Sequence, residues 1–180
     1  VMASTSDSPR AIFVSAFDSS PLAPDYELLY NGEGEFFKIG IEILKKLTKG
    51  SVHLNTNADA EVSKIFASAK GVQVNKVSGP HPAGNVGVQI HHIDPINKGD
   101  LVWTVAPYGV IQIGKLFAEG KYYAAKIIAV VGSEVKNPQY YKTFQGAQLK
   151  PFLDGNVNEG SVRVISGNVL NGEKLTEENY

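Results

Sequence analysis

RAIFVSAF, residues Arg10–Phe17, is a compact run of strand-forming residues that ends just before an aspartate. A short apolar run of this kind, bounded by turn signals, is typical of a strand that is buried on both faces. The next ten residues, Asp18–Glu27, contain two prolines and predict an extended loop. In a nucleotide-binding βαβ unit a glycine-rich turn stands here, because glycine lets the backbone approach a phosphate. Asp18–Asp25 contains no glycine, which argues against a dinucleotide at this loop.

Helices and strands alternate after this first strand. The expected elements are, in order, a helix over Glu35–Leu47, a strand over Ser51–Leu54, a helix over residues 60–69 and a strand over Val72–Val77. We expect Gly50 and Gly71 to end the two helices, and Asn57 or Asp59 to cap the second one. The side chains expected to face inward are Phe36, Phe37, Gly40, Ile43, Leu44, Leu47, Val62, Ile65 and Phe66. This alternation predicts an α/β fold with a parallel sheet and right-handed crossovers, which is Rossmann-like.

The pattern changes near Lys121. Before it, a strand is expected over Leu101–Val105 and a helix over Tyr108–Glu119 that ends at Gly120. The side chains of that helix expected to face inward are Val110, Ile113, Leu116 and Phe117. After it, the expected elements are strands over Tyr123–Val131, Gln139–Phe144 and Ser161–Ser166, and a short helix over Ala147–Leu153. We therefore expect a Rossmann-like α/β domain over residues 1–121 and an incomplete β-grasp domain over residues 122–180.

Composition excludes several classes of function. The 180 residues include 17 basic and 18 acidic side chains, so no strong field attracts nucleic acid. Cysteine is absent, which excludes disulfides, thiolate nucleophiles and Cys-ligated iron–sulfur clusters. No apolar run approaches the length needed to cross a bilayer, so we expect no direct membrane span.

The segment Ser78–Asp94, SGPHPAGNVGVQIHHID, holds three of the four histidines. Its two prolines favour an extended approach, and Gly84 and Gly87 permit positive φ or close backbone contact. The prolines of this segment and those after the first strand would meet at the carboxyl edge of the sheet, where open α/β sheets bind ligands. The residues expected to form a ligand or docking loop are Pro80, His81, Pro82, Gly84 and His91. Simple stiffening of the loop by proline is the competing interpretation.

Metal binding and catalysis are both disfavoured for these histidines. Adjacent His91 and His92 on a helix would point about a quarter-turn apart, so they cannot ligate one ion without strain. Pairing of His81 with Asp94 or Asp18 would suggest acid–base work, since histidine titrates near neutral pH. No serine motif or spaced carboxylate pair supports such chemistry. We therefore assign no catalytic and no metal-binding residue, and expect a histidine that organises the loop.

Three pieces of the chain carry a resemblance to a known family. They are Ala11–Glu27, Gly79–Pro95 and Val164–Gly172 (VISGNVLNG). Together they resemble the A subunit of the sodium-translocating NADH:quinone reductase, and the resemblance covers nearly the whole chain. We expect the chain to be an internal fragment of such a protein. The family has a β-grasp domain of the soluble-ligand-binding type. Its hairpin signature resembles the pattern formed here by Gly132, Val135, Pro138 and Tyr140.

The resemblance implies both an architecture and a role. The A subunit is similar in fold to the flavin-bearing subunit of respiratory complex I. The intact assembly oxidises NADH, reduces ubiquinone and exports sodium, and the A subunit is peripheral, on the cytoplasmic face of the bacterial inner membrane. FMN and NAD belong to other subunits, so we expect neither here, whereas quinone is expected at the level of the whole subunit.

The fragment would accordingly hold no tightly bound redox centre. It would serve assembly with the other subunits of the membrane complex and the shaping of the quinone site, and would be enzymatic only as part of the reductase. The alternative is a free-standing flavin- or nucleotide-binding oxidoreductase domain, which the glycine-free loop after the first strand disfavours.

Overall fold

The computed structural model describes residues 3–61 and 63–176, and the chain divides into two compact units. Unit 1 comprises the residues up to Ser19 together with Asp25–Tyr123, and unit 2 comprises Ser20–Pro24 and the residues from Ala124 onward. No helix in the described ranges combines the length and the apolar character that a bilayer crossing requires.

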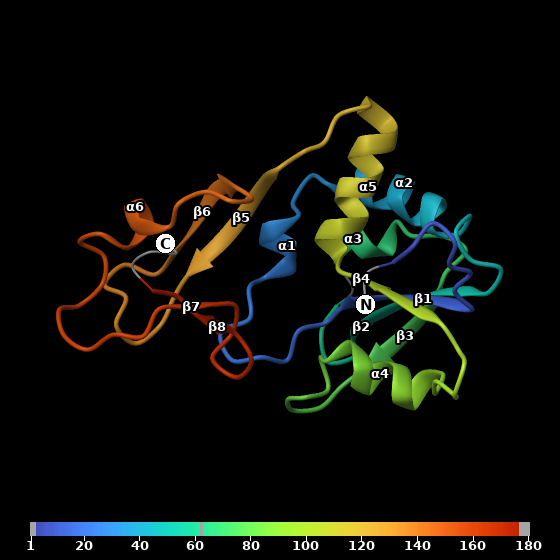
Figure 1. Ribbon diagram of the computed structural model, residues 1–180, viewed down its shortest axis with the longest axis horizontal. Coiled ribbons are helices and arrows are strands. Elements are labelled where there is room, and N and C mark those ends of the chain that lie inside the picture. Colours follow the sequence, from blue (N-terminus) through green and yellow to red (C-terminus); the bar gives the residue numbers. More distant parts are fainter. Residues whose placement is uncertain (1–2, 62, 177–180) are drawn as a thin grey trace. The chain divides into compact units, whose positions relative to one another are not determined.

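Unit 1 is built on a parallel four-stranded sheet with the strand order β3-β2-β1-β4 (Figure 1). The strands are β1 (Ala11–Ala16), β2 (Ser51–Asn57), β3 (Gln73–Val77) and β4 (Val102–Val105). The register places Phe13 opposite His53 on one side and Thr104 on the other. The predicted parallel sheet and the buried first strand are confirmed, because β1 lies between two partners and is covered on both faces.

Helices cover both faces of this sheet. They are α1 (Tyr26–Leu29), α2 (Gly34–Leu44), α3 (Lys64–Ala67), α4 (Val86–Ile93) and α5 (Pro107–Glu119). Figure 1 shows α2, α3 and α5 on one side of the sheet and α4 on the other. Two separate apolar clusters agree with this arrangement, one beneath α2, α3 and α5 and a smaller one beneath α4.

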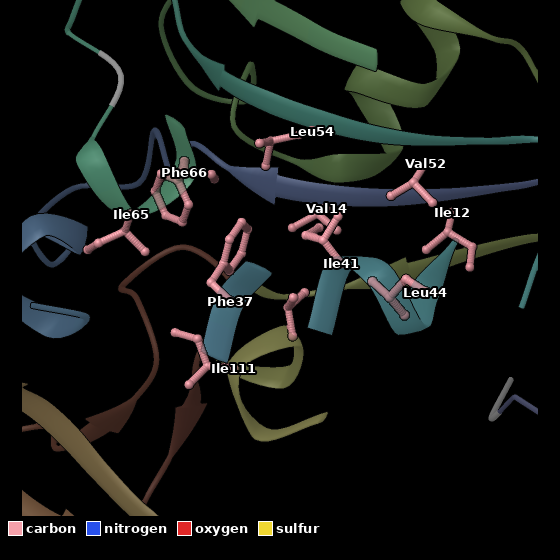
Figure 2. Close-up of a cluster of buried hydrophobic side chains, with 12 residues drawn as sticks. Ile12, Val14, Phe37, Ile41, Leu44, Val52, Leu54, Ile65, Phe66 and Ile111 are labelled. Carbon is pink, nitrogen blue, oxygen red and sulfur yellow. The ribbon is translucent and has the colours of Figure 1, made fainter. Parts of the chain in front are cut away.

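The larger cluster is the main core of unit 1. In Figure 2 the side chains of the sheet face those of α2 and α3. Its buried members are Ile12, Val14, Ala16, Phe37, Ile41, Leu44, Val52, Leu54, Ile65, Phe66, Val110 and Ile111. Helices α2 and α5 cross closely at two glycines, because a Cβ on Gly40 would overlap the Val110 carbonyl and one on Gly114 would overlap the Phe36 carbonyl. The smaller cluster joins Ala11, Phe13 and Ile90.

The predicted first helix is correct in place but too long. It ends at Leu44, so Leu47 lies outside it and is 45% exposed, while Ile41 is fully buried and Ile43 only partly. Gly50 is not its stop. This glycine lies directly against the Arg10 carbonyl, which leaves no space for a side chain.

The predicted second helix is shorter than expected. Strand β2 continues to Asn57, which pairs with β3, and the helix begins only at Lys64, so neither Asn57 nor Asp59 caps it. Ser63 caps it instead, accepting a hydrogen bond from the Ile65 N–H, and the helix ends at Ala67, before Gly71. Ile65 and Phe66 are buried as predicted, whereas Val62 lies outside the described residues.

Helix α5 ends at Gly120 as predicted, with a φ of 70°. Its inward face was predicted only in part. Val110 is fully buried, but Leu116 and Phe117 are 43% and 64% exposed. Ile111 and Lys115 are buried in their place, because the crossing with α2 lies along the stripe that contains Gly114.

Unit 2 consists of small antiparallel sheets. Strands β5 (Ala125–Val130) and β6 (Gln139–Phe144) form a hairpin, as predicted. The predicted helix shrinks to α6 (Lys150–Leu153), and Phe152 of this helix contacts the ring of Tyr141. The predicted third strand shrinks to β7 (Ile165–Ser166), which pairs with β8 (Glu173–Lys174). The fold is therefore α/β with a parallel sheet, followed by small antiparallel sheets.

Candidate functional site

The PHPAG loop, defined as residues 80–84, lies against the segment that follows β1. The Gly84 N–H donates a 2.8 Å hydrogen bond to Ser19 Oγ, which is also 3.2 Å from His81 Nδ1. A Cβ on Gly84 would overlap the backbone nitrogen of Ser19. Close backbone approach is thus the reason for glycine here, as predicted. Neither positive φ nor close backbone contact explains Gly87, which lies in the first turn of α4 with open space around it.

The loop closes on itself instead of running extended. The Ala83 N–H donates to the Pro80 carbonyl at 2.9 Å, and the Asn85 N–H donates to the Pro82 carbonyl at 2.8 Å. The His81–Pro82 peptide bond is cis. The prediction of an extended approach is therefore wrong for these residues, because two consecutive backbone hydrogen bonds bend them into turns.

Both ends of one peptide unit anchor this loop. The Ala83 carbonyl accepts a 3.1 Å hydrogen bond from Gln89 Nε2, and the N–H of the same peptide, on Gly84, donates to Ser19 Oγ. Gln89 lies in α4 and is only 2% exposed. The loop is held from the β1 side and from the α4 side at the same point.

A chain of hydrogen-bonded polar side chains, made of three amides and one imidazole, leads to this anchor, and sequence reasoning missed it. We name it the amide chain, and it consists of His53, Asn75, Asn55 and Gln89. Asn55 Nδ2 donates to Gln89 Oε1 at 2.8 Å, Asn75 Nδ2 donates to Asn55 Oδ1 at 2.8 Å, and Asn75 Nδ2 is 3.3 Å from His53 Nδ1. The sequence did contain a signal for a polar face of β2, because polar and apolar residues alternate along its first residues (SVHLNTN).

His53 is the titratable member of the amide chain. Its ring stacks on Phe13 with centroids 4.2 Å apart, and the residue is 4% exposed. Burial lowers the pKa of His53, the charge of Asp94 acts to raise it, and Arg10 acts to lower it. The neutral ring can accept a hydrogen bond from Asn75 at Nδ1.

Arg10 forms ion pairs with two carboxylates at the edge of the sheet opposite to the PHPAG loop. Its Nη1 lies 2.7 Å from Asp94 Oδ2 and its Nε 3.1 Å from Asp100 Oδ2. The hydrogen bond to Asp94 raises the pKa of Arg10. The pKa of Asp100 is lowered, mainly by the hydrogen bond from the Asn97 backbone N–H and to a lesser extent by Arg10. Since Arg10 precedes β1 and Ser19 follows it, Asp94 lies at the other end of the strand from His81. The structure therefore does not bring His81 and Asp94 together as an acid–base pair, which the sequence had already disfavoured.

The structure brings together most, but not all, of the residues expected in the site. Pro80, His81, Pro82 and Gly84 belong to one anchored loop. His91 is exposed in the last turn of α4, and its ring lies 5.5 Å from that of His92 in an edge-on arrangement. Within residues 3–61 and 63–176 no three His, Asp or Glu side chains group in a way that could hold a metal ion.

A second polar cluster lies around α5. Lys115 Nζ is 2.7 Å from Glu33 Oε1 and 3.7 Å from the centre of the Tyr123 ring, with only 7% of the lysine side chain exposed. Nearby, burial raises the pKa of Tyr26 to about 12 and also raises that of Tyr30. These phenols stay protonated at neutral pH, and the buried Lys115 is paired with Glu33.

The chain is thus an α/β protein in which a parallel-sheet unit, with an anchored loop at its carboxyl edge, is followed by a small antiparallel module. Two family models match in the same order. Residues 1–122 match the NqrA second alpha/beta domain, and residues 127–177 match the NQRA C-terminal domain. The chain belongs to the NqrA family.

Curated relatives are named as the A subunit of Na(+)-translocating NADH-quinone reductase. The protein of Yersinia pestis bv. Antiqua (strain Angola) is 42% identical over 164 residues, which are 91% of this chain and 36% of that protein. The protein of Alcanivorax borkumensis is 40% identical over the same shares. The protein of Photorhabdus laumondii is 38% identical over 96% of this chain and 38% of its own length. The chain thus spans little more than a third of the relatives that it matches.

Proposed function

We propose that the chain is part of the A subunit of the sodium-translocating NADH:ubiquinone reductase, a translocase that couples respiratory electron transfer to sodium export. In this role it is peripheral, on the cytoplasmic face of the bacterial inner membrane, and its partners are the other subunits. The matches to both NqrA family models and to relatives that carry the name of this protein support the proposal. The reductase activity belongs to the whole assembly.

We further propose that residues 1–121 form a Rossmann-like domain and residues 122–180 an incomplete β-grasp. The strand order β3-β2-β1-β4 supports the first part, because it is the order of one half of a doubly wound sheet plus the next strand. The hairpin of β5 and β6, followed by α6, supports the second.

The contact of Gly84 with Ser19 carries the proposal that this piece holds no tightly bound FMN or NAD. In a dinucleotide-binding sheet the turn after the first strand is open, so that phosphate reaches backbone N–H groups. Here the backbone of Gly84 packs directly on Ser19 and occupies that approach. We propose that the PHPAG loop, presenting Pro80, His81 and Pro82, instead serves assembly and the shaping of the quinone site.

A free-standing flavin- or nucleotide-binding oxidoreductase domain is the second candidate. One observation favours it. The strand order reverses at β1, between β2 and β4, and open α/β sheets bind ligands outside the carboxyl ends of strands at such a point.

A ligand titration separates the two candidates. The chain would be examined by visible absorption and by thermal shift against FMN, NADH and a soluble short-chain quinone, because a ligand that binds the native state stabilises it. We expect a colourless protein, no shift with FMN or NADH, and a shift with quinone that His81→Gln weakens. His92→Gln, at an exposed position of α4, is the matched control and should behave as wild type. A yellow protein, or saturable stabilisation by FMN or NADH, would favour the second candidate.

A further inference from the structure

The direction of the hydrogen bonds in the amide chain is determined at its end. The Ala83 carbonyl can only accept, so Gln89 must turn its Nε2 toward it, at 3.1 Å. The Oε1 of Gln89 then faces Asn55, which must donate from Nδ2. Asn55 in turn presents Oδ1 to Asn75, which must also donate from Nδ2. Each amide orients the next one, and no member can reverse alone.

The other end of the amide chain meets His53. The Asn75 Nδ2 group that donates to Asn55 also lies 3.3 Å from His53 Nδ1. A neutral ring that carries its hydrogen on Nε2 offers an acceptor at Nδ1, and in this tautomer all contacts are complementary. A protonated ring carries a hydrogen there, which sets two donors against each other. Turning Asn75 to relieve this clash reverses each amide in sequence and leaves Gln89 Oε1 facing the Ala83 carbonyl, which is a repulsive contact between two acceptors.

We propose that Gln89 is a positioning residue for the PHPAG loop, and that its hold on the loop requires neutral His53 at the far end of the amide chain. The inference rests on the proposed role of this loop in docking or quinone-site shaping. Acidification then loosens the Ala83–Gly84 anchor, and with it His81, before the sheet itself opens.

The surroundings of His53 are compatible with such a role. The charged groups acting on its ring are Arg10, at the start of β1, and Asp94, at the end of α4. These two groups pair with each other at 2.7 Å, so their opposed effects on His53 partly cancel. The groups that face the ring from β1 and β3 are the aromatic Phe13 and the uncharged Asn75.

Amide hydrogen exchange of the whole chain, followed by ¹⁵N NMR, tests the proposal without any ligand. The reporter is the Gly84 amide, whose N–H is bound to Ser19 Oγ, and the reference is the backbone of β1. Between about pH 8 and about pH 5, the range in which histidine titrates, wild-type protection at Gly84 should fall about tenfold, the effect of losing one hydrogen bond. Protection in β1 should stay constant after correction for intrinsic rates.

Three variants sharpen the test. Gln89→Met should show low Gly84 protection at both pH values, because the last bond of the amide chain is missing. His53→Gln keeps an acceptor but cannot titrate, so it should retain high protection at both. His91→Gln, exposed on the same helix as Gln89, should follow wild type.

Two outcomes would overturn the proposal. One is wild-type protection at Gly84 that does not change with pH, which needs no variant to establish. The other is a His53→Gln protein that keeps the wild-type pH dependence. Because the free chain is measured, the amide chain can be established even if the quinone titration described above fails, and the reverse also holds.

Discussion

The two faces of the sheet in unit 1 are built on different principles. On the face toward α2 and α5 the buried strand side chains are mostly aliphatic, and they pack into one large cluster. On the face toward α4, Phe13 stacks on His53, and Asn55 joins Asn75 to Gln89. Apolar burial is strong but has no direction, whereas hydrogen bonds are weak in net terms and directional. The first face therefore supplies stability, and the second places a particular loop.

The largest effect is expected on the apolar face. Phe37→Ala removes a fully buried ring from the main core and should lower the free energy of unfolding by about 4 kcal/mol. Urea denaturation measures this change. Phe117→Ala on α5, where the ring is 64% exposed, is the control and should change stability by less than about 0.5 kcal/mol. Equal effects of the two substitutions would contradict the assignment of the core.

The next largest effect on stability is expected at Lys115, the buried lysine of α5. Glu33→Gln leaves the buried Lys115 charge without its carboxylate and should cost about 3 kcal/mol. Lys115→Met should cost less, about 1 kcal/mol, because Glu33 is partly exposed and water can solvate it. The same urea titrations compare the two variants. A larger loss for Lys115→Met would show that the pair is not governed by burial of the lysine.

A smaller effect is expected on the polar face. Asn55→Leu leaves groups of both Asn75 and Gln89 without partners, and should cost about 2 kcal/mol. The double variant Asn55→Leu/Gln89→Leu should lose less stability than the sum of the two single variants, because the two residues share one hydrogen bond. A double-mutant cycle measures this coupling. Strict additivity would mean that the bond between Asn55 and Gln89 contributes nothing.

The smallest effect is a pH dependence that arises from His53. Burial lowers its folded-state pKa below the ordinary value of 6.5, so the unfolded chain binds more protons as the pH falls past that value. This contribution to stability is fully present above 6.5 and is lost as the pH falls through the lowered pKa. Urea midpoints measured across this range should decline less in His53→Gln than in wild type. His92→Gln should decline as wild type does, and an unchanged slope in His53→Gln would contradict the prediction.

The long elements of unit 1 were predictable because their signals are local. The apolar run of β1 and the Gly120 stop of α5 need no knowledge of distant residues. The inward face of α5 was only half predictable. Helical spacing does not say which of two neighbouring stripes meets a partner, and the close crossing at Gly114 decided against Phe117.

The candidate site divides in the same way. The sequence marked Gly84 as a residue that needs close contact, yet its partner Ser19 stands 65 residues earlier in the chain. His91 looked equivalent to His81 by residue type, but α4 carries it away from the loop toward the other edge of the sheet. Distance along the chain gave no means of separating the two histidines.

The sequence by itself determined which residues of β2 face which side, since strand side chains alternate and Val52 and Leu54 alternate with His53 and Asn55. It also determined that the turn after β1 lacks the glycines of a phosphate-binding loop. Only the tertiary structure decided which polar groups meet. Asn55 and Gln89 are 34 residues apart, and the direction of their hydrogen bond depends on a backbone carbonyl in a third segment. Burial follows from local pattern, whereas hydrogen-bond partners follow from the positions of segments brought together by folding.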